Sequence, residues 1–160
     1  MKRLEVKLSL PVVAPLLDVI KGMAESLRGS LAAPLGVADL DAEFATAWAD
    51  ELVAAQNDDV QALLALFDAN FFAEGLIAFD ATNAEPIIRA TAALRLRLRG
   101  YYLKPLADEA LESGQIELAQ LDESLRKPFM CYLFLATIQE LIIQQLDERD
   151  PEPPADDLDP

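Results

Sequence analysis

Residues 129–146, FMCYLFLATIQELIIQQL, are the most hydrophobic segment of the chain and contain one charged residue, Glu140. Apolar residues surround the first two turns of a helix drawn over this segment, which is typical of a helix packed on several sides. We therefore predict a central C-terminal helix around which the other elements fold. Pro128 precedes it and either opens this helix or lies inside a longer one that begins near Asp122.

Length and composition indicate one globular domain. The chain has 160 residues, of which 52% are hydrophobic and 26% charged, enough to build a core without disulfides or metals. Residues 147–160 contain seven acids and four prolines beside a single base, a composition typical of disorder. We predict a domain over residues 1–146 and a disordered acidic, proline-rich tail over residues 147–160.

The residue counts exclude many enzyme classes. The chain has no histidine and one cysteine, Cys131. This excludes histidine-assisted nucleophiles, histidine-ligated metals and intramolecular disulfides. Cys131 lies on an apolar helix face and is expected to be buried and inert. No loop that would bind a nucleotide or a metal is found, and we predict no catalytic residues, no cofactor and no metal site.

Charge and hydropathy also limit the partners. The formal net charge is −15, and so acidic a surface argues against nucleic acid as a partner. The charged N-terminus lacks the apolar run of a signal peptide. The uncharged stretch from Pro128 to Gln139 is too short to cross a bilayer. We predict a soluble, cytoplasmic protein that does not bind membranes.

Periodicity predicts an α+β fold that is predominantly α: a helical bundle around the central C-terminal helix, with a small two-stranded β-ribbon. Residues 3–10 alternate polar and apolar, as a half-buried strand does, and the apolar run 75–79 is its expected partner. Helices are predicted over residues 12–28, from Asp39 or Asp41 to residue 67, from a capping box at Thr82 and Glu85 to residue 100, and between residues 105 and 112.

Two of these helices carry open questions. Residues 39–67 form either one helix or two, with Phe44, Ala47, Trp48, Leu52 and Ala55 on an apolar face that Glu51 interrupts. Residues 94–99, LRLRLR, alternate strictly and would also suit a strand. The alanine-rich approach and the cap signal before them favour a helix.

The basic residues gather in one segment. Residues 29–88 contain no Lys or Arg, whereas Arg89, Arg95, Arg97, Arg99 and Lys104 follow without an intervening acid. One interpretation is that these arginines fold against the acidic segments and neutralise them. The other is a binding site for an acidic or carboxylate-bearing partner, since a guanidinium is a planar donor suited to carboxylates. The candidate binding residues are Arg89, Arg95, Arg97, Arg99 and Tyr102, and Tyr101 and Tyr102 are both placed to stack on a guanidinium.

The segment Leu76–Asp80, which runs into Asn83 and Ala84 and then into residues 94–100, resembles a bacterial family of unknown function. That family is best represented in actinobacteria and is often encoded beside the ClpS protease adaptor. The likeness covers most of residues 1–103, although Ala92 and Ala93 stand where the family usually has an Asn-Asp pair. It implies a connection with protein turnover and supplies no catalytic residues.

These observations lead to two hypotheses about function. The first is a non-enzymatic protein–protein interaction or adaptor-type domain with a protein partner, possible homodimerisation included. The alternative is a small-anion or carboxylate binder, or an enzyme, that uses the arginine cluster.

Overall fold

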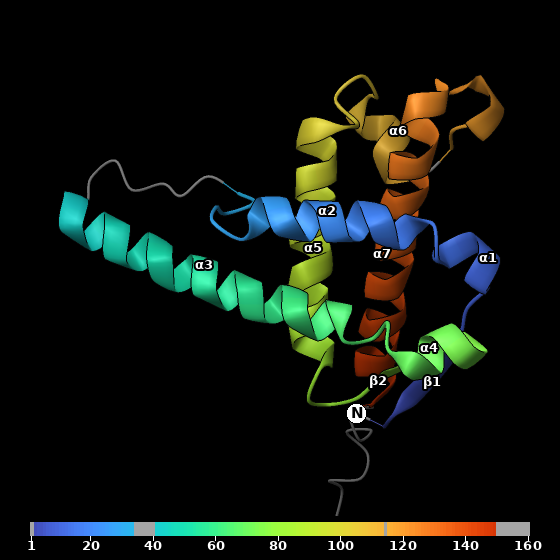
Figure 1. Ribbon diagram of the computed structural model, residues 1–160, viewed down its shortest axis with the longest axis horizontal. Helices are drawn as coiled ribbons and strands as arrows, with labels where there is room; N and C mark the ends of the chain where they lie inside the picture. The colour runs from blue at the N-terminus through green and yellow to red at the C-terminus, as the bar shows by residue number, and fades with distance from the viewer. Residues whose placement is uncertain (1, 34–40, 114, 150–160) are drawn as a thin grey trace, which may run out of the picture.

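The computed structural model describes residues 2–33, 41–113 and 115–149 (Figure 1). Helices dominate it, and the two strands form a small sheet. The elements in chain order are β1 (Leu4–Lys7), α1 (Leu10–Val13), α2 (Leu16–Leu27), α3 (Ala42–Leu64), α4 (Ala69–Glu74), β2 (Leu76–Phe79), α5 (Ala84–Tyr101), α6 (Asp108–Ser113), a 3-10 turn η1 (Leu118–Gln120) and α7 (Glu123–Arg149).

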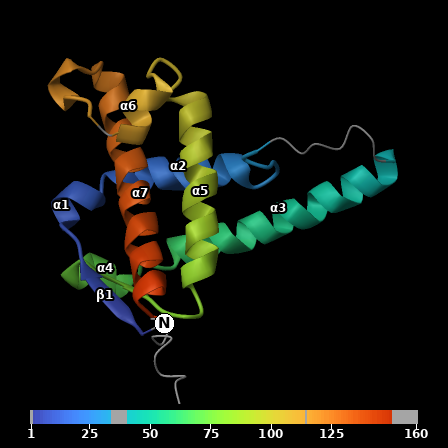
Figure 2. The same ribbon diagram turned by 180° about the vertical axis from the view of Figure 1, so that it is seen from behind.

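Helices α5 and α7 lie side by side and run in opposite directions (Figures 1 and 2). Helix α2 crosses one face of this pair, and α3 crosses α5 on the same face. The core forms where these helices meet. Its fully buried members include Ile20 and Leu27 from α2, Leu63 from α3, Ile87, Leu94 and Leu98 from α5, and Phe129, Leu135 and Ile142 from α7. The predicted α+β, predominantly α architecture with a long hydrophobic C-terminal helix is confirmed.

The two strands pair as predicted, and their pairing is antiparallel. Leu4 lies opposite Phe79 and Lys7 opposite Leu76. The first strand is shorter than the alternation suggested, because Leu10 already belongs to α1. The backbone N–H of Leu8 donates to the carbonyl of Gly75 at 2.7 Å and ends the ribbon.

The helix predicted over residues 12–28 is divided into α1 and α2. Pro15 stands between them as the residue that precedes the first turn of α2. A proline has no N–H for the preceding turn and its ring crowds the carbonyl four residues earlier. One uninterrupted helix over this region was therefore wrong.

Residues 42–64 form a single helix, α3, which answers the question left open by the sequence. Its 23 residues include only two buried ones, Val60 and Leu63, both near the C-terminal end. The remainder projects away from the body of the protein (Figure 1). We call residues 42–55 of α3 the arm.

Two polar side chains shape the turns around β2. Asp68 caps the short helix α4, which the sequence analysis missed, by accepting a hydrogen bond from the N–H of Phe71 at 3.1 Å. Helix α5 is preceded by Asn83, not by the predicted cap Thr82. The amide of Asn83 instead bridges the loop, accepting from the N–H of Asp80 and donating to the carbonyl of Ala78. Because α5 begins one residue later than predicted, Thr82 does not cap it and the capping box of Thr82 and Glu85 does not form.

Pro128 lies inside α7, which begins at Glu123, so the second alternative for this proline is the correct one. Its position in the second turn leaves one carbonyl of the first turn without its helical partner. The helix continues to Arg149, three residues beyond the predicted domain boundary. The rest of the predicted tail, residues 150–160, lies outside the described residues.

The stretch Glu123–Leu146 of α7 is long and apolar enough to cross a membrane by length and composition alone, with a mean hydropathy of 1.4. The prediction from sequence was based on the shorter, uncharged stretch from Pro128 to Gln139. In the structure one face of α7 packs against α2 and α5, and residues such as Tyr132, Leu135 and Ile138 are buried there. About a third of the stretch, 33%, is buried inside the protein.

Gly75 provides a test of the ribbon. It adopts φ +74°, and a Cβ at this position would lie 2.5 Å from the carbonyl oxygen of Leu8. We expect Gly75→Ala to lower the free energy of unfolding by at least about 2 kcal/mol. Gly22→Ala is the matched control, because Gly22 is helical with open space around it, and it should raise stability by about 0.5–1 kcal/mol. Equal effects of the two substitutions in urea denaturation would contradict this account.

Candidate functional site

The arginines of α5 point to two different sides of the helix. At 100° per residue, Arg89 and Arg97 lie about 80° apart, and Arg95 and Arg99 lie about 40° apart. Arg89 and Arg97 contact α3 and the segment after α2, whereas Arg95 contacts α7 and Arg99 contacts α6. One helix thus holds together four neighbouring parts of the fold.

Arg89 forms a bidentate ion pair with Asp59 of α3. Its Nε and Nη2 each lie 3.0 Å from a carboxylate oxygen. The hydrogen bond to Asp59 is the main cause of the raised pKa of Arg89. The side chain of Asp59 is only 14% exposed. Arg89 therefore pairs with a carboxylate that is largely shielded from solvent.

Arg97 and Arg99 are also engaged within the chain. Arg99 donates to Asp108, and this hydrogen bond raises its pKa. Arg97 donates to the hydroxyl of Ser30 at 2.9 Å, to the carbonyl of Leu31 at 3.3 Å and to the hydroxyl of Tyr101 at 3.1 Å. Its guanidinium carbon lies 5.1 Å from the Tyr101 ring centroid, a cation–π geometry.

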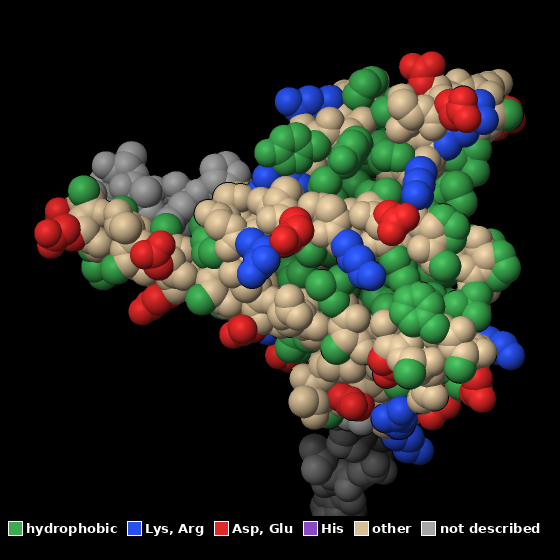
Figure 3. Space-filling model, viewed as in Figure 1, with side chains coloured by type: hydrophobic (Ala, Val, Ile, Leu, Met, Phe, Trp, Pro, Cys, Tyr) green, Lys and Arg blue, Asp and Glu red, His purple; other side chains and the backbone are tan. Residues whose placement is uncertain are grey.

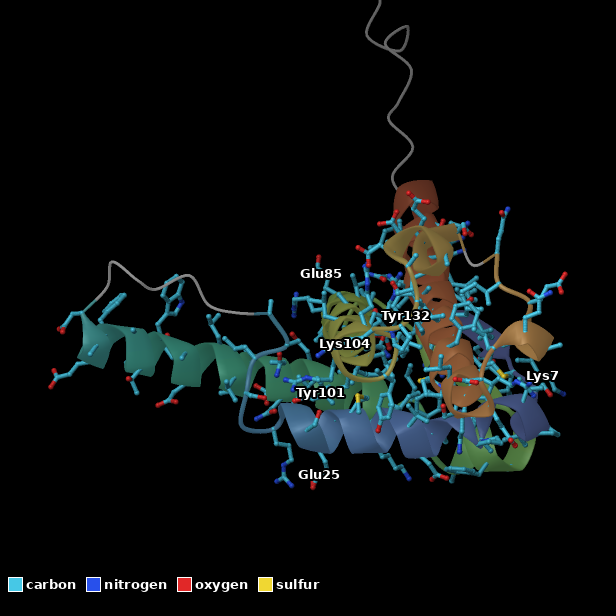
Figure 4. The ribbon with its side chains drawn as sticks, turned by 90° about the horizontal axis from the view of Figure 1, so that it is seen from above. Lys7, Glu25, Glu85, Tyr101, Lys104 and Tyr132 are labelled. Atoms are coloured by element: carbon cyan, nitrogen blue, oxygen red, sulfur yellow. The ribbon has the colours of Figure 1, made fainter. Side chains whose placement is uncertain are left out.

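Arg95 of α5 reaches α7, where it contacts the buried Tyr132. Figure 4 labels Tyr132 where α5 and α7 meet. It donates to Gln139 at 2.8 Å and to the hydroxyl of Tyr132 at 3.1 Å, and its guanidinium sits 4.6 Å from the Tyr132 ring centroid. Within the described chain its Nε is buried without a hydrogen-bond partner. Neutral acceptors and an aromatic ring thus stabilise this cation in place of a carboxylate.

The candidate binding residues therefore do not converge on one place. Tyr102 follows the last residue of α5, donates its N–H to the carbonyl of Leu98 and keeps a side chain that is exposed to solvent. The aromatic partners of the arginines are Tyr101 for Arg97 and Tyr132 for Arg95. The four guanidiniums have four separate sets of partners. Arg89 and Arg99 pair with carboxylates, as the neutralising interpretation predicts, whereas Arg95 and Arg97 donate to neutral groups.

The single cysteine has the environment of an inert thiol. Cys131 is buried in the core, and this burial raises its pKa from 9.0 to about 12. A thiol that stays protonated is a poor nucleophile and metal ligand. No group of three or more residues able to hold a metal ion occurs among the residues that the structure describes.

The sequence predicts an apolar face over residues 44–55. The structure places that face in solvent, which the sequence does not predict. Phe44 is 59% exposed and Trp48 is 40% exposed, and their ring centroids lie 6.3 Å apart. With Leu52 and Ala55 they occupy one side of α3, within about 80° of each other around the helix axis. Aromatic residues are enriched at protein–protein interfaces relative to the rest of protein surfaces.

An apolar groove continues this side of the arm toward the body of the protein. It has a volume of about 420 Å³ and lies between α3, α5 and the segment after α2. Its apolar lining comprises Leu31, Ala32, Ala33, Leu52, Ala55, Ala93 and Leu96. Leu96 is 48% exposed, so the groove is open to solvent. We call the groove together with Phe44 and Trp48 the arm surface.

Two side-chain amides fix the arm to the end of α2. Gln56 donates to the carbonyls of Leu27 and Ser30, at 3.1 and 2.8 Å, and accepts from the N–H of Ala32 at 3.0 Å. Asn57 donates to the carbonyl of Arg28 at 3.1 Å. The last carbonyls of a helix have no partner within the helix, so these contacts satisfy α2 and orient α3 together.

The chain matches no model of a known protein family, no curated protein and no solved structure. The resemblance of residues 76–100 to the family encoded beside ClpS therefore stays a prediction.

The pair of Arg89 and Asp59 should be energetically coupled. A double-mutant cycle with Arg89→Ala and Asp59→Ala should give a coupling energy of about 1 kcal/mol that falls as salt is added. Arg28 and Glu25 form the matched control pair, with both side chains largely exposed, and their cycle should give a value near zero. Urea denaturation of the single and double variants measures both. Equal coupling energies in the two cycles would show that the burial of Asp59 does not strengthen its interaction with Arg89.

The buried thiol should make stability depend on alkaline pH. Above about pH 9 the unfolded chain loses the Cys131 proton while the folded chain keeps it up to about pH 12. The folded state then binds more protons, so the free energy of unfolding should fall as pH rises through this window. Cys131→Ala should remove that part of the slope. The check is urea denaturation of both proteins between pH 8 and 10, and parallel slopes would contradict the assignment.

Proposed function

We propose that this protein is a non-enzymatic protein–protein interaction domain of the adaptor type, and that it binds its partner through the arm surface. The observation that carries the proposal is the projection of α3, with Phe44 and Trp48 exposed far from the core. Aromatic residues contribute a large share of binding energy at interfaces. The arm, residues 42–55, is about as long as the isolated helices that are marginally stable in water. A bound partner would stabilise it.

The engagement of the arginines supports the same proposal. Each guanidinium of the α5 cluster donates to a group of the chain itself. Arg89 donates to Asp59, Arg95 to Tyr132, Arg97 to Ser30 and Arg99 to Asp108. Small-anion binding at the cluster would require those contacts to break. The alternative of an arginine-based binder or enzyme therefore gains no support from this geometry.

A role in protein turnover and a cytoplasmic location remain parts of the proposal that the sequence motivates. The first rests on the resemblance to the family encoded beside ClpS, and the second on the acidic composition with a single cysteine.

The proposal is tested by capture of partners with and without the arm aromatics. We expect the wild-type protein to retain a reproducible set of proteins from an extract of the source organism. The double variant Phe44→Ser, Trp48→Ser should lose that set, because it removes the exposed aromatic contacts. Its melting temperature should stay within about 4 °C of wild type, since the buried residues of α3 are unchanged.

Phe72→Ser is the matched control, since Phe72 is 54% exposed on α4, away from the arm. This variant should retain the same proteins as wild type. An identical retained set for the arm variant and the wild type would refute the proposal, and so would turnover of a metabolite that depends on Arg95.

A further inference from the structure

We infer that the arm surface takes a basic amphipathic helix of a partner protein, seated in the corner between the arm and α5. This inference rests on the proposed function and specifies the chemistry of its partner. Two helices meeting at an angle offer a groove into which the apolar side of a third helix packs. The arm supplies one wall of that groove, and Ala93 and Leu96 of α5 supply the other.

The size of the surface suits such a helix. From Phe44 to Ala55 the arm extends over about 17 Å at 1.5 Å per residue, the length of three turns of a partner helix. On α5, Arg89, Ala93 and Leu96 lie on one side, because residues spaced by four and seven positions share a helix face. Both walls therefore present rows with helical spacing, which apolar residues at i, i+3, i+4 and i+7 of a partner would match.

The charge of the arm selects a basic partner. Residues 42–59 contain no Lys or Arg and five acids, namely Glu43, Asp50, Glu51, Asp58 and Asp59. Red acidic side chains follow the arm in Figure 3. Glu51 and Asp58 lie within about 60° of Phe44 and Ala55 around the helix axis, beside the apolar row. At the groove Asp59 is paired with Arg89, and Arg97 lies at the end formed by Leu31. The negative charge offered to a partner therefore lies along the arm and its continuation, at Glu43, Asp50, Glu51 and Asp58.

The same charges argue against a second copy of this chain as the occupant. Two arms laid against each other would bring two sets of three acids together, Glu43, Asp50 and Glu51 of each copy, and the arm itself contains no base. Like charges placed opposite one another at an interface cost several kcal/mol. The net charge of −15 adds repulsion between whole molecules. A partner helix rich in Lys and Arg avoids this repulsion, and its charges attract the carboxylates of the arm.

Trp48 is the only tryptophan of the chain, and its fluorescence reports directly on the arm. We would titrate the full chain with an 18-residue amphipathic helical peptide of Leu and Lys. Two control peptides are a scrambled version of the same composition and a Leu/Glu version of the same pattern. The Leu/Lys peptide should shift the Trp48 emission to the blue and bind at least about tenfold tighter than the scrambled peptide. The Leu/Glu peptide should not bind.

A charge-adding variant separates docking from simple attraction. Leu96→Glu makes the protein more acidic, yet should weaken binding of the Leu/Lys peptide about tenfold because it places a charge in the apolar groove. Leu118→Glu is the matched control: Leu118 is 39% exposed on η1, and this variant should bind the peptide as well as wild type or slightly better. Ala93→Glu replaces Leu96→Glu if circular dichroism shows that the latter is unfolded.

Three outcomes would overturn the inference: equal binding of the amphipathic and scrambled basic peptides, tighter binding by Leu96→Glu, or a dimer in sedimentation that Trp48→Ala abolishes. If the peptide fails while the arm variant still loses its captured proteins, the partner chemistry is wrong and the proposed function stands. If both experiments fail, the arm is not an interaction surface.

Discussion

Burial of the apolar side of α5 is the constraint on which the rest of the structure depends. Ile87, Ala90, Leu94 and Leu98 are fully buried, and α2, α3 and α7 all contact this helix. Burying a leucine side chain contributes about 1.5–3 kcal/mol, so this row is a major source of stability. Because this row faces the core, the position of each α5 arginine around the helix is fixed. That position decides which neighbouring segment the arginine reaches.

The strict alternation of residues 94–99 then acquires a structural explanation. In a helix, Leu94 and Leu98 fall on the buried side, whereas Leu96 falls on the opposite side and lines the groove. Arg95, Arg97 and Arg99 fall between, where their long stems lie along apolar surface and their guanidiniums reach polar groups of other elements. A repeat that looks like a strand therefore lets one helix bind neighbours on several sides.

The sequence predicted the parts of the fold that local patterns determine. The strands, the C-terminal helix and the buried side of α5 each have a period that identifies them. The breaks were harder to predict, because they depend on single contacts. Pro15 divides one expected helix, and the amide of Asn83 is used to bridge the loop instead of a cap at Thr82. Helix α4 had a usable signal in Asp68 and Gly75, a cap and a left-handed glycine seven residues apart.

The exposure of the arm is a different kind of result, because amphipathic spacing predicts a face and not what covers it. The row of Phe44, Trp48 and Leu52 has the pattern of a core helix, yet the direction of α3 is set elsewhere, by Gln56 and Asn57 at the end of α2. Those two amides orient the helix so that only its last turns reach the core. The absence of any base from residues 29–88 fits this placement: the described acids outnumber the cations that α5 offers, and a solvent-exposed arm is where unpaired carboxylates cost least.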